Sequence, residues 1–213
     1  MTQWVRNPTG GRDRGPVALA RAWFEILTRP RRFFRAAIAP GDQAPGLVFL
    51  ATVVAIAVGS RFVLVPGSYP VVGGRPVASA LLWLALLVLL AAPAALHLTA
   101  ALQTLLLLAF VDDRAGVSQT VQVIAYATAP CVVAGIPIPG LRLACCVYGT
   151  VLLAIGMAEV HDVPLVQASV LVAVPAALVF GYAFGGFAAA ETVGETVART
   201  LDRRFDVDVT VGF

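Results

Sequence analysis

Three groups of side chains in this sequence are of types that could carry chemistry. The first is a basic-aromatic cluster in which four arginines and two phenylalanines lie within seven residues. The second is a set of polar residues inside long apolar segments, and the third is two short acidic runs, one with a histidine. In order, these groups are Arg29, Arg31, Arg32, Phe33, Phe34 and Arg35; His97, Gln119, Gln122 and Tyr126; and Asp112, Asp113, Glu159, His161 and Asp162.

The acidic runs are the only group with metal-ligand chemistry. Glu159, His161 and Asp162 could hold a metal ion, but their spacing is not diagnostic of any metal. A solvated loop end, or an ion-pair partner for the arginine cluster, is the favoured interpretation. The sequence has no H-E-x-x-H motif, no phosphate-binding glycine loop with a lysine, and no nucleophile triad around His97 or His161. We therefore expect no enzyme activity, no cofactor and no metal.

The composition places these residues in a membrane protein. The 213-residue chain is 59% hydrophobic and only 13% charged, whereas soluble domains carry about 25% charged residues. Eight of its arginines precede the first long apolar segment. Membrane headgroups explain them better than nucleic acid does, so no nucleic-acid partner is expected. Cys131, Cys145 and Cys146 lie in apolar runs and are expected to be buried and unpaired.

The apolar runs predict an all-α bundle of five transmembrane helices, residues 47–188, with spans at about 47–65, 77–111, 119–136, 141–160 and 164–187. A C-terminal tail follows at 189–213. Its alternating Phe205, Val207, Val209 and Val211 fit a short strand or a disordered end.

The second run, 77–111, is longer than one span needs. Its 35 residues would extend about 52 Å as a helix, against a hydrocarbon core of about 30 Å. It is either a hairpin that turns near Pro93 or one long helix kinked there. The sequence around Pro93 has no polar or glycine-rich turn, which favours the single helix.

The residues before the first span, 1–46, are expected to form a cytoplasmic arm with an interfacial amphipathic helix. Pro16–Thr28 would place Val17, Ala20, Trp23, Phe24 and Leu27 on one face, and Pro30 would end the helix. The arginine cluster would then hold its phenylalanines at the acyl boundary and its guanidinium groups on anionic headgroups. It could serve as a topology anchor, as a docking surface, or as both.

Arginine counts predict the orientation. With the N-terminus inside, nine arginines precede the first span or lie in inner loops, two lie in outer loops and three in the tail. Because arginines near spans tend to stay cytoplasmic, we expect a multi-pass plasma-membrane protein with its N-terminus in the cytoplasm and its C-terminus outside.

Polar groups within a bilayer are costly and each needs a partner. His97 could bond a backbone carbonyl at the Pro93 kink, and Arg61 could extend to the interface. Gln119, Gln122 and Tyr126 share one helix face, which predicts hydrogen bonds between helices. The alternative is that these three residues and His97 line a polar transport cavity.

Three motifs resemble those of the Yip-one domain family, the Ypt/Rab-interacting membrane proteins, in a prokaryotic or archaeal form. They are Pro-Arg-Arg-Phe-Phe at 30–34, Ala-Tyr-Ala-x-x-Pro at 125–130 and Gly-x-x-Glu-x-His at 156–161. The resemblance covers about residues 21–186 and implies five spans and a cytoplasmic N-terminus. It also implies an adaptor role without catalysis, although the long N-terminal extension typical of eukaryotic members is missing.

The sequence thus predicts a non-enzymatic membrane scaffold that recruits a protein partner through the arginine cluster. A homo-oligomer is the other association expected. Transport through a polar intramembrane stripe is the main alternative. A membrane-embedded metalloenzyme using Glu159, His161 and Asp162 is the weaker one.

Overall fold

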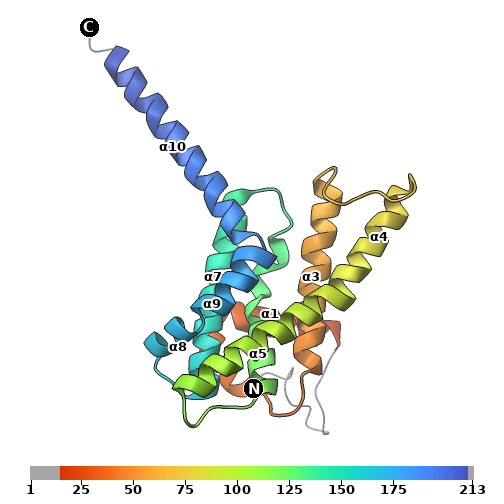
Figure 1. Cartoon of the computed structure of the whole chain (residues 1–213), viewed down its shortest axis with the longest axis vertical. Coiled ribbons are helices and arrows are strands. Elements are labelled where there is room, and N and C mark those ends of the chain that lie inside the picture. The colour runs from red at the N-terminus through yellow and green to blue at the C-terminus, as the bar shows by residue number, and fades with distance from the viewer. Residues whose placement is uncertain (1–14, 211–213) are drawn as a thin grey trace.

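The computed structural model describes residues 15–210, and side chains over 15–202, as an all-helical protein (Figure 1). In this part of the chain there is no strand. The elements are α1 (Pro16–Thr28), α2 (Pro30–Ala37), α3 (Ala44–Leu64), α4 (Pro76–Leu86), η1 (Leu87–Ala91), α5 (Ala92–Phe110), α6 (Val117–Ala127), η2 (Ala129–Val133), α7 (Pro139–His161), α8 (Leu165–Leu171), α9 (Ala173–Ala176), η3 (Ala177–Ala183) and α10 (Gly186–Thr210).

Three helices are long and apolar enough to cross a membrane. They are α3 with 21 residues, the continuous helix Pro76–Phe110 with 35, and α7 with 23. At 1.5 Å per residue, α3 alone extends about 31 Å, which matches the hydrocarbon core. The chain is therefore a multi-pass membrane protein.

The expected second span is one long helix, and the hairpin alternative is excluded. Leu87–Ala91 forms a π-helical turn, and Pro93 follows near the start of α5. A π turn gives the backbone room to accommodate a proline without breaking the helix. Only 6% of the most apolar 18-residue window of this helix is buried within the protein, whereas Leu96, Thr99, Ala100, Gln103 and Leu107 of α5 are buried.

The expected third and fifth spans are not regular membrane-crossing helices. Val117–Val133 is apolar but shorter, and its last five residues form the 3-10 helix η2, which contains Pro130. The segments Leu165–Leu171 and Ala173–Ala183 meet at an angle of 56°. Pro175 has no N–H to bond the carbonyl of Leu171, which explains the break at this point. The structure thus supports three spans, or four if this bent pair crosses, and does not confirm five.

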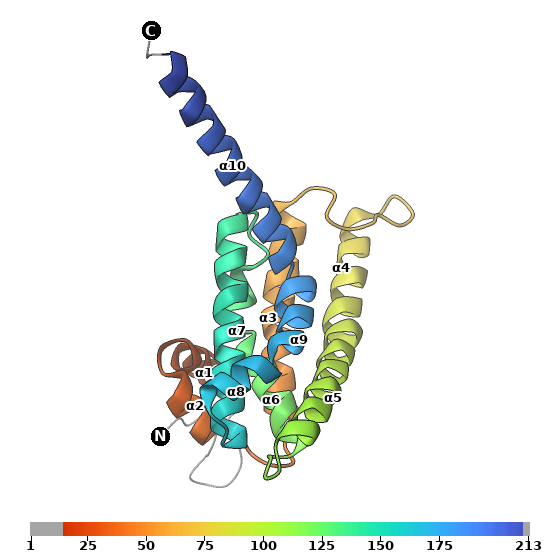
Figure 2. The same ribbon diagram turned by 60° about the vertical axis from the view of Figure 1, so that its left-hand side comes forward.

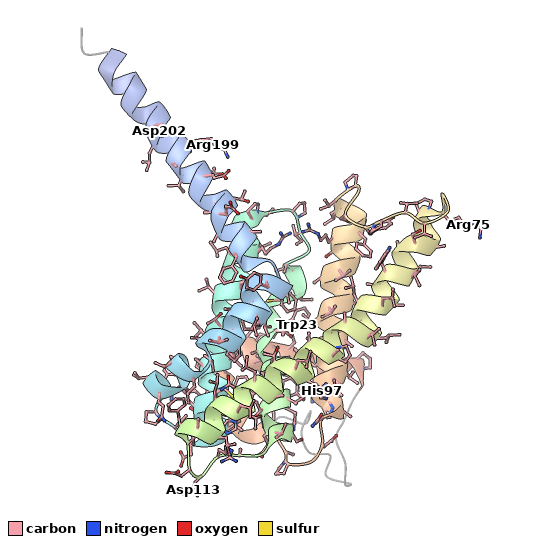
Figure 3. All side chains as sticks on the ribbon, in the orientation of Figure 1. Trp23, Arg75, His97, Asp113, Arg199 and Asp202 are labelled. Atoms are coloured by element: carbon pink, nitrogen blue, oxygen red, sulfur yellow. The ribbon has the colours of Figure 1, made fainter. Side chains whose placement is uncertain are left out.

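The helices α1 and α2 pack against one end of the bundle, and α10 leaves from the other (Figure 2). Charged residues mark the same two ends: Figure 3 shows Asp113 at the lower end and Arg75 at the upper end. The largest buried side chain is that of Tyr126, on α6. It lies where α2, α3 and α6 meet, so the N-terminal helices belong to the core.

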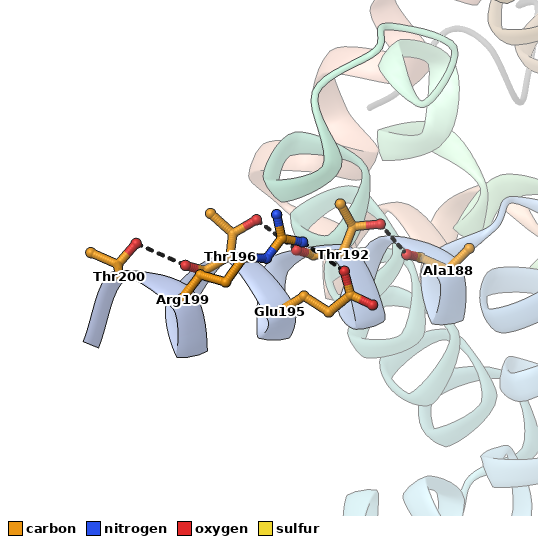
Figure 4. Close-up of polar contacts among 6 residues, drawn as sticks. All are labelled: Ala188, Thr192, Glu195, Thr196, Arg199 and Thr200. Atoms are coloured by element: carbon orange, nitrogen blue, oxygen red, sulfur yellow. Dashed lines mark hydrogen bonds and ion pairs between the residues drawn. The ribbon is translucent and has the colours of Figure 1, made fainter. Parts of the chain in front are cut away.

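The C-terminal tail is a helix, not a strand or a disordered end. Arg199 pairs with Glu195 four residues earlier, and Thr192, Thr196 and Thr200 each donate to the carbonyl four residues before them (Figure 4). The helical backbone continues to Thr210 through the alternating apolar residues; Val211 lies outside the described residues. Beyond its first turns α10 stands clear of the bundle (Figure 1).

Candidate functional site: the junction of α2, α6 and α7

The two phenylalanines of the basic-aromatic cluster point into the protein. Phe33 is fully buried and packs edge-to-face on Tyr126, with ring centroids 5.0 Å apart. Tyr126 packs in turn on Phe49 of α3, at 5.2 Å. Phe34 is also buried, at 1% exposure. The expectation that these rings lie at the acyl boundary or in a contact surface is wrong, because the bundle itself covers them.

A glycine of α7 makes room for Phe34. A Cβ added at Gly156 would lie 3.0 Å from the Phe34 ring and 2.6 Å from Cγ1 of Val123. The backbone of α7 can approach α2 and α6 only because this position has no side chain. The Gly-x-x-Glu-x-His motif at 156–161 therefore has a packing role at its first residue.

The arginines divide into two pairs. Arg31 Nη1 lies 3.1 Å from Glu159 Oε1, and Arg35 Nε donates to Glu159 Oε2. Glu159 thus serves the cluster as an ion-pair partner, which was the favoured interpretation of its run. Over the side chains of residues 15–202, no hydrogen bond or ion pair is made by the guanidinium groups of Arg29 and Arg32.

Two further polar contacts fix the N-terminal helices on the bundle. Trp23 Nε1 donates to the Ala129 carbonyl at 2.8 Å, and the Tyr148 hydroxyl donates to the Leu27 carbonyl at 2.5 Å. The buried face of α1 consists of Ala18, Ala22 and Ile26. Val17 and Phe24, from the expected apolar face, are 68% and 67% exposed and are therefore free to contact the membrane.

The polar residues of α6, Gln119, Gln122 and Tyr126, all make contacts within the protein. Gln122 Nε2 donates to the Ala39 carbonyl at 2.7 Å, and Gln122 Oε1 accepts from the Ala39 N–H at 3.4 Å. Gln119 Oε1 accepts from the Gly116 N–H at the start of its own helix. Gln122 thus bonds the loop between α2 and α3 and not a neighbouring helix, whereas Gln119 caps α6 and Tyr126 packs with aromatic rings.

His161 is buried beside the start of α6. Its Nδ1 accepts from the Ala115 N–H at 3.2 Å, which leaves Nε2, 3.3 Å from Thr120 Oγ1, to carry the proton. Asp162 is exposed and ends α7 in the left-handed conformation, with φ of 52°. Glu159, His161 and Asp162 therefore do not converge, and no group of three metal-binding side chains occurs in the described part of the chain.

His97, on α5, makes its hydrogen bonds with residues outside the junction. Its Nδ1 is 2.7 Å from the Pro93 carbonyl, and its Nε2 is 3.1 Å from Gln43 Oε1. The expected contact with a backbone carbonyl at the kink is present. The contact with Gln43 also ties the long helix to the start of α3.

A cavity of about 490 Å³ lies between α3, the long helix, α7 and the η3–α10 segment. None of His97, Gln119, Gln122 and Tyr126 lines it, so the transport hypothesis loses the residues on which it was based. Two arginines line it instead, Arg61 and Arg142. Sequence reasoning treated Arg61 as an interface anchor and overlooked Arg142, because 80 residues separate two side chains that only the fold brings together.

The junction is built for rigid attachment. Aromatic packing, a close glycine contact, an ion-paired carboxylate and backbone-directed hydrogen bonds all attach α1 and α2 to the bundle. The hydroxyl of Thr120 lies beside the His161 imidazole, but this contact is buried and Nε2 carries the proton, so the imidazole is not placed to act as a base on the hydroxyl. The class defined by this fold and site is a multi-pass helical membrane protein whose N-terminal helices are packed into its core.

The chain belongs to the Yip1 domain family, whose model matches residues 24–187. This range contains the three motifs named above, and the structure brings residues of all three together at the junction. The family is one of membrane proteins that are generally not catalytic. No curated protein and no solved structure matches the chain.

Proposed function

We propose that this protein is a non-enzymatic membrane scaffold that recruits a protein partner through the exposed face of α2. The observation that carries the proposal is the division of the arginine cluster. Buried Phe33 and Phe34 hold α2 on the bundle, and Glu159 neutralises part of the charge of Arg31 and Arg35. Arg32 is exposed on α2, and Arg29 is exposed at the residue that directly precedes this helix.

Two exposed guanidinium groups on an ordered backbone suit an acidic protein surface. Arginine presents donors in a rigid fork that matches carboxylate geometry, and α2 is pre-ordered, so little entropy is lost when a partner binds. The neighbouring helix α1 exposes Val17 and Phe24, which would rest in the membrane beside the bound partner. Anionic headgroups at the same level would add to the attraction.

The proposed orientation places α1 and α2 on the cytoplasmic side and the end of α10 outside. The arginine count of the sequence supports it, as does the exit of α10 from the end of the bundle opposite α2 (Figure 2). A partner recruited in this way would be cytoplasmic.

The test is cross-linking in cells followed by purification in mild detergent, with Arg29→Ser/Arg32→Ser beside the wild type. Arg75→Ser is a matched control, because Arg75 is an exposed arginine at the other end of the molecule. We expect an acidic protein that is recovered with the wild type and with Arg75→Ser but is lost from the double variant.

Orientation reporters on all three proteins separate lost recruitment from altered topology. The double variant keeps Arg31, Arg35 and both phenylalanines, so α2 should stay in place. Equal recovery of the partner from the double variant and the wild type, or recovery of nothing but a second copy of this chain, would contradict the proposal.

A further inference from the structure

The cavity beside the long helix has a polar end and an apolar body. Its polar end carries Arg61 and Arg142, and most of the remaining lining is aliphatic or aromatic. No aspartate or glutamate is among the residues described around it. Such a cavity is within the size range of small-molecule sites, about 300–1,000 Å³.

Both arginines lie at the same membrane level. Arg61 is in the last turn of α3, and Arg142 is the fourth residue of α7, which runs in the opposite direction. Since α3 is about as long as the hydrocarbon core is thick, its last turn lies at the interface, where lipid phosphates are found. This is the end of the bundle away from α1 and α2 (Figure 2).

Arg142 is held in position for a ligand. Its Nε donates to the Ala134 carbonyl at 2.9 Å, and Gly185 packs on its stem, so that a Cβ there would lie 3.6 Å from Cδ. No other hydrogen bond and no ion pair of its guanidinium is found among the described residues. The Arg61 side chain makes no hydrogen bond or ion pair there. Two uncompensated positive charges thus line one cavity, an arrangement that favours an anion between them.

The apolar body has the depth of one leaflet. It follows α3 from Arg61 down to Leu50, a distance of about 16 Å, which is close to half of a hydrocarbon core of about 30 Å. Leu87, Ala91 and Ala95 of the long helix form the facing wall. Small side chains on this wall leave space for a hydrocarbon chain.

From these observations we infer that the cavity binds an anionic phospholipid, with its phosphate on Arg61 and Arg142 and an acyl chain along α3. The site is distinct from the α2 surface and does not depend on the proposed recruiting role. It lies in the opposite leaflet, so it also differs from headgroup binding by the N-terminal arm.

The test is native mass spectrometry of the full chain, purified in mild detergent and mixed with dioleoyl phosphatidylglycerol or dioleoyl phosphatidylcholine. We expect a one-to-one adduct that prefers phosphatidylglycerol. Arg61→Gln/Arg142→Gln should weaken it about tenfold or more, since each lost charged hydrogen bond is worth about 1.5–3 kcal/mol and about 1.4 kcal/mol is tenfold. Arg75→Gln, which removes an arginine at the same end but outside the cavity, should keep the wild-type adduct.

A second pair of variants tests the apolar body without changing the charge. Ala95→Trp fills the cavity wall, whereas Ala94→Trp places the same side chain on the exposed surface of α5 outside the lining. We expect the adduct to be lost only from Ala95→Trp. Equal adducts in both pairs would overturn the inference. So would displacement of the lipid by millimolar inorganic phosphate, because the site would then hold phosphate alone.

Discussion

At the scale of single residues, two fully buried glutamines differ in whether their side-chain amides are hydrogen-bonded. Gln122 is hydrogen-bonded to both backbone groups of Ala39 and so fixes the chain that links α2 to α3. Gln103, on α5, has neither amide atom paired within the described residues. An unpaired buried polar group costs about 1–3 kcal/mol, so these two residues should respond in opposite directions to the same substitution.

We expect Gln103→Leu to stabilise the protein by about 1 kcal/mol, because it replaces an unpaired amide with an apolar group of similar size. Gln122→Leu should destabilise it by about 2 kcal/mol, because Ala39 would lose its partners. Thermal unfolding in detergent measures both. A lower stability of Gln103→Leu would mean that its amide has a partner, such as water, that stabilises the fold.

The arginine cluster shows what sequence can and cannot say about a residue. Its composition drew attention to the right segment, and its pairing with the acids of the fourth span was anticipated. The burial of Phe33 and Phe34 was not, because a phenylalanine between arginines has the same local pattern whether lipid or protein covers it. The burial of Phe34 depends on the space left at Gly156, which lies more than 120 positions further along the chain.

At the scale of elements, α2 is held on α7 by shape and by charge, and each can be changed separately. Gly156→Ala would place a methyl group 2.6 Å from Val123 and 3.0 Å from the Phe34 ring. Alanine usually stabilises a helix interior relative to glycine by about 0.5–1 kcal/mol. Overpacking costs about 1–3 kcal/mol, so we expect a net loss of stability.

The matched control is Gly194→Ala, in the exposed part of α10, where an added Cβ meets nothing within 4 Å. Thermal unfolding should show a decrease for Gly156→Ala and no decrease for Gly194→Ala. If Gly156→Ala were as stable as the wild type, the close packing of α2 on α7 would be contradicted.

The ion pairs of Glu159 with Arg31 and Arg35 also attach α2 to α7. We expect Glu159→Gln to weaken the attachment of α2 by about 2 kcal/mol, because charged hydrogen bonds to Arg31 and Arg35 are lost. Hydrogen–deuterium exchange of the α2 amides should then rise, while exchange in α3 stays unchanged. Asp162→Asn, which changes an exposed acid three residues later, serves as the control. Unchanged exchange in α2 would show that the ion pairs contribute nothing to its attachment.

Two places where the expected and observed elements differ are the bend near Pro175 and the helical C-terminal tail. The long helix was predicted because no turn chemistry surrounds Pro93. The bend between α8 and α9 was missed, although Pro175 was visible, because hydropathy does not respond to one lost hydrogen bond. In the tail, alternation suggested a strand, but the four-residue spacing of Thr192, Thr196 and Thr200, and of Glu195 and Arg199, is the helical signal.

At the scale of the whole molecule, the two ends of the bundle carry different surfaces. One end holds the docked N-terminal helices and the exposed arginines of α2. The other holds the base of α10 (Figure 2), and the two arginines of the proposed lipid cavity lie toward it, at the end of α3 and the start of α7. In the proposed orientation, the exposed arginines of α2 would face one compartment and α10 would project into the other.

This arrangement gives a direct expectation for labelling in intact cells. Ala36→Cys, on the exposed side of α2, and Thr200→Cys, on the exposed part of α10, should lie on opposite sides of the membrane. A maleimide that cannot cross the membrane should label Thr200→Cys from outside and should reach Ala36→Cys only after lysis. The native cysteines Cys131, Cys145 and Cys146 are all buried, so the wild type is the background control. Labelling of both positions from the same side would contradict the proposed orientation, because α2 and the end of α10 would then lie in one compartment.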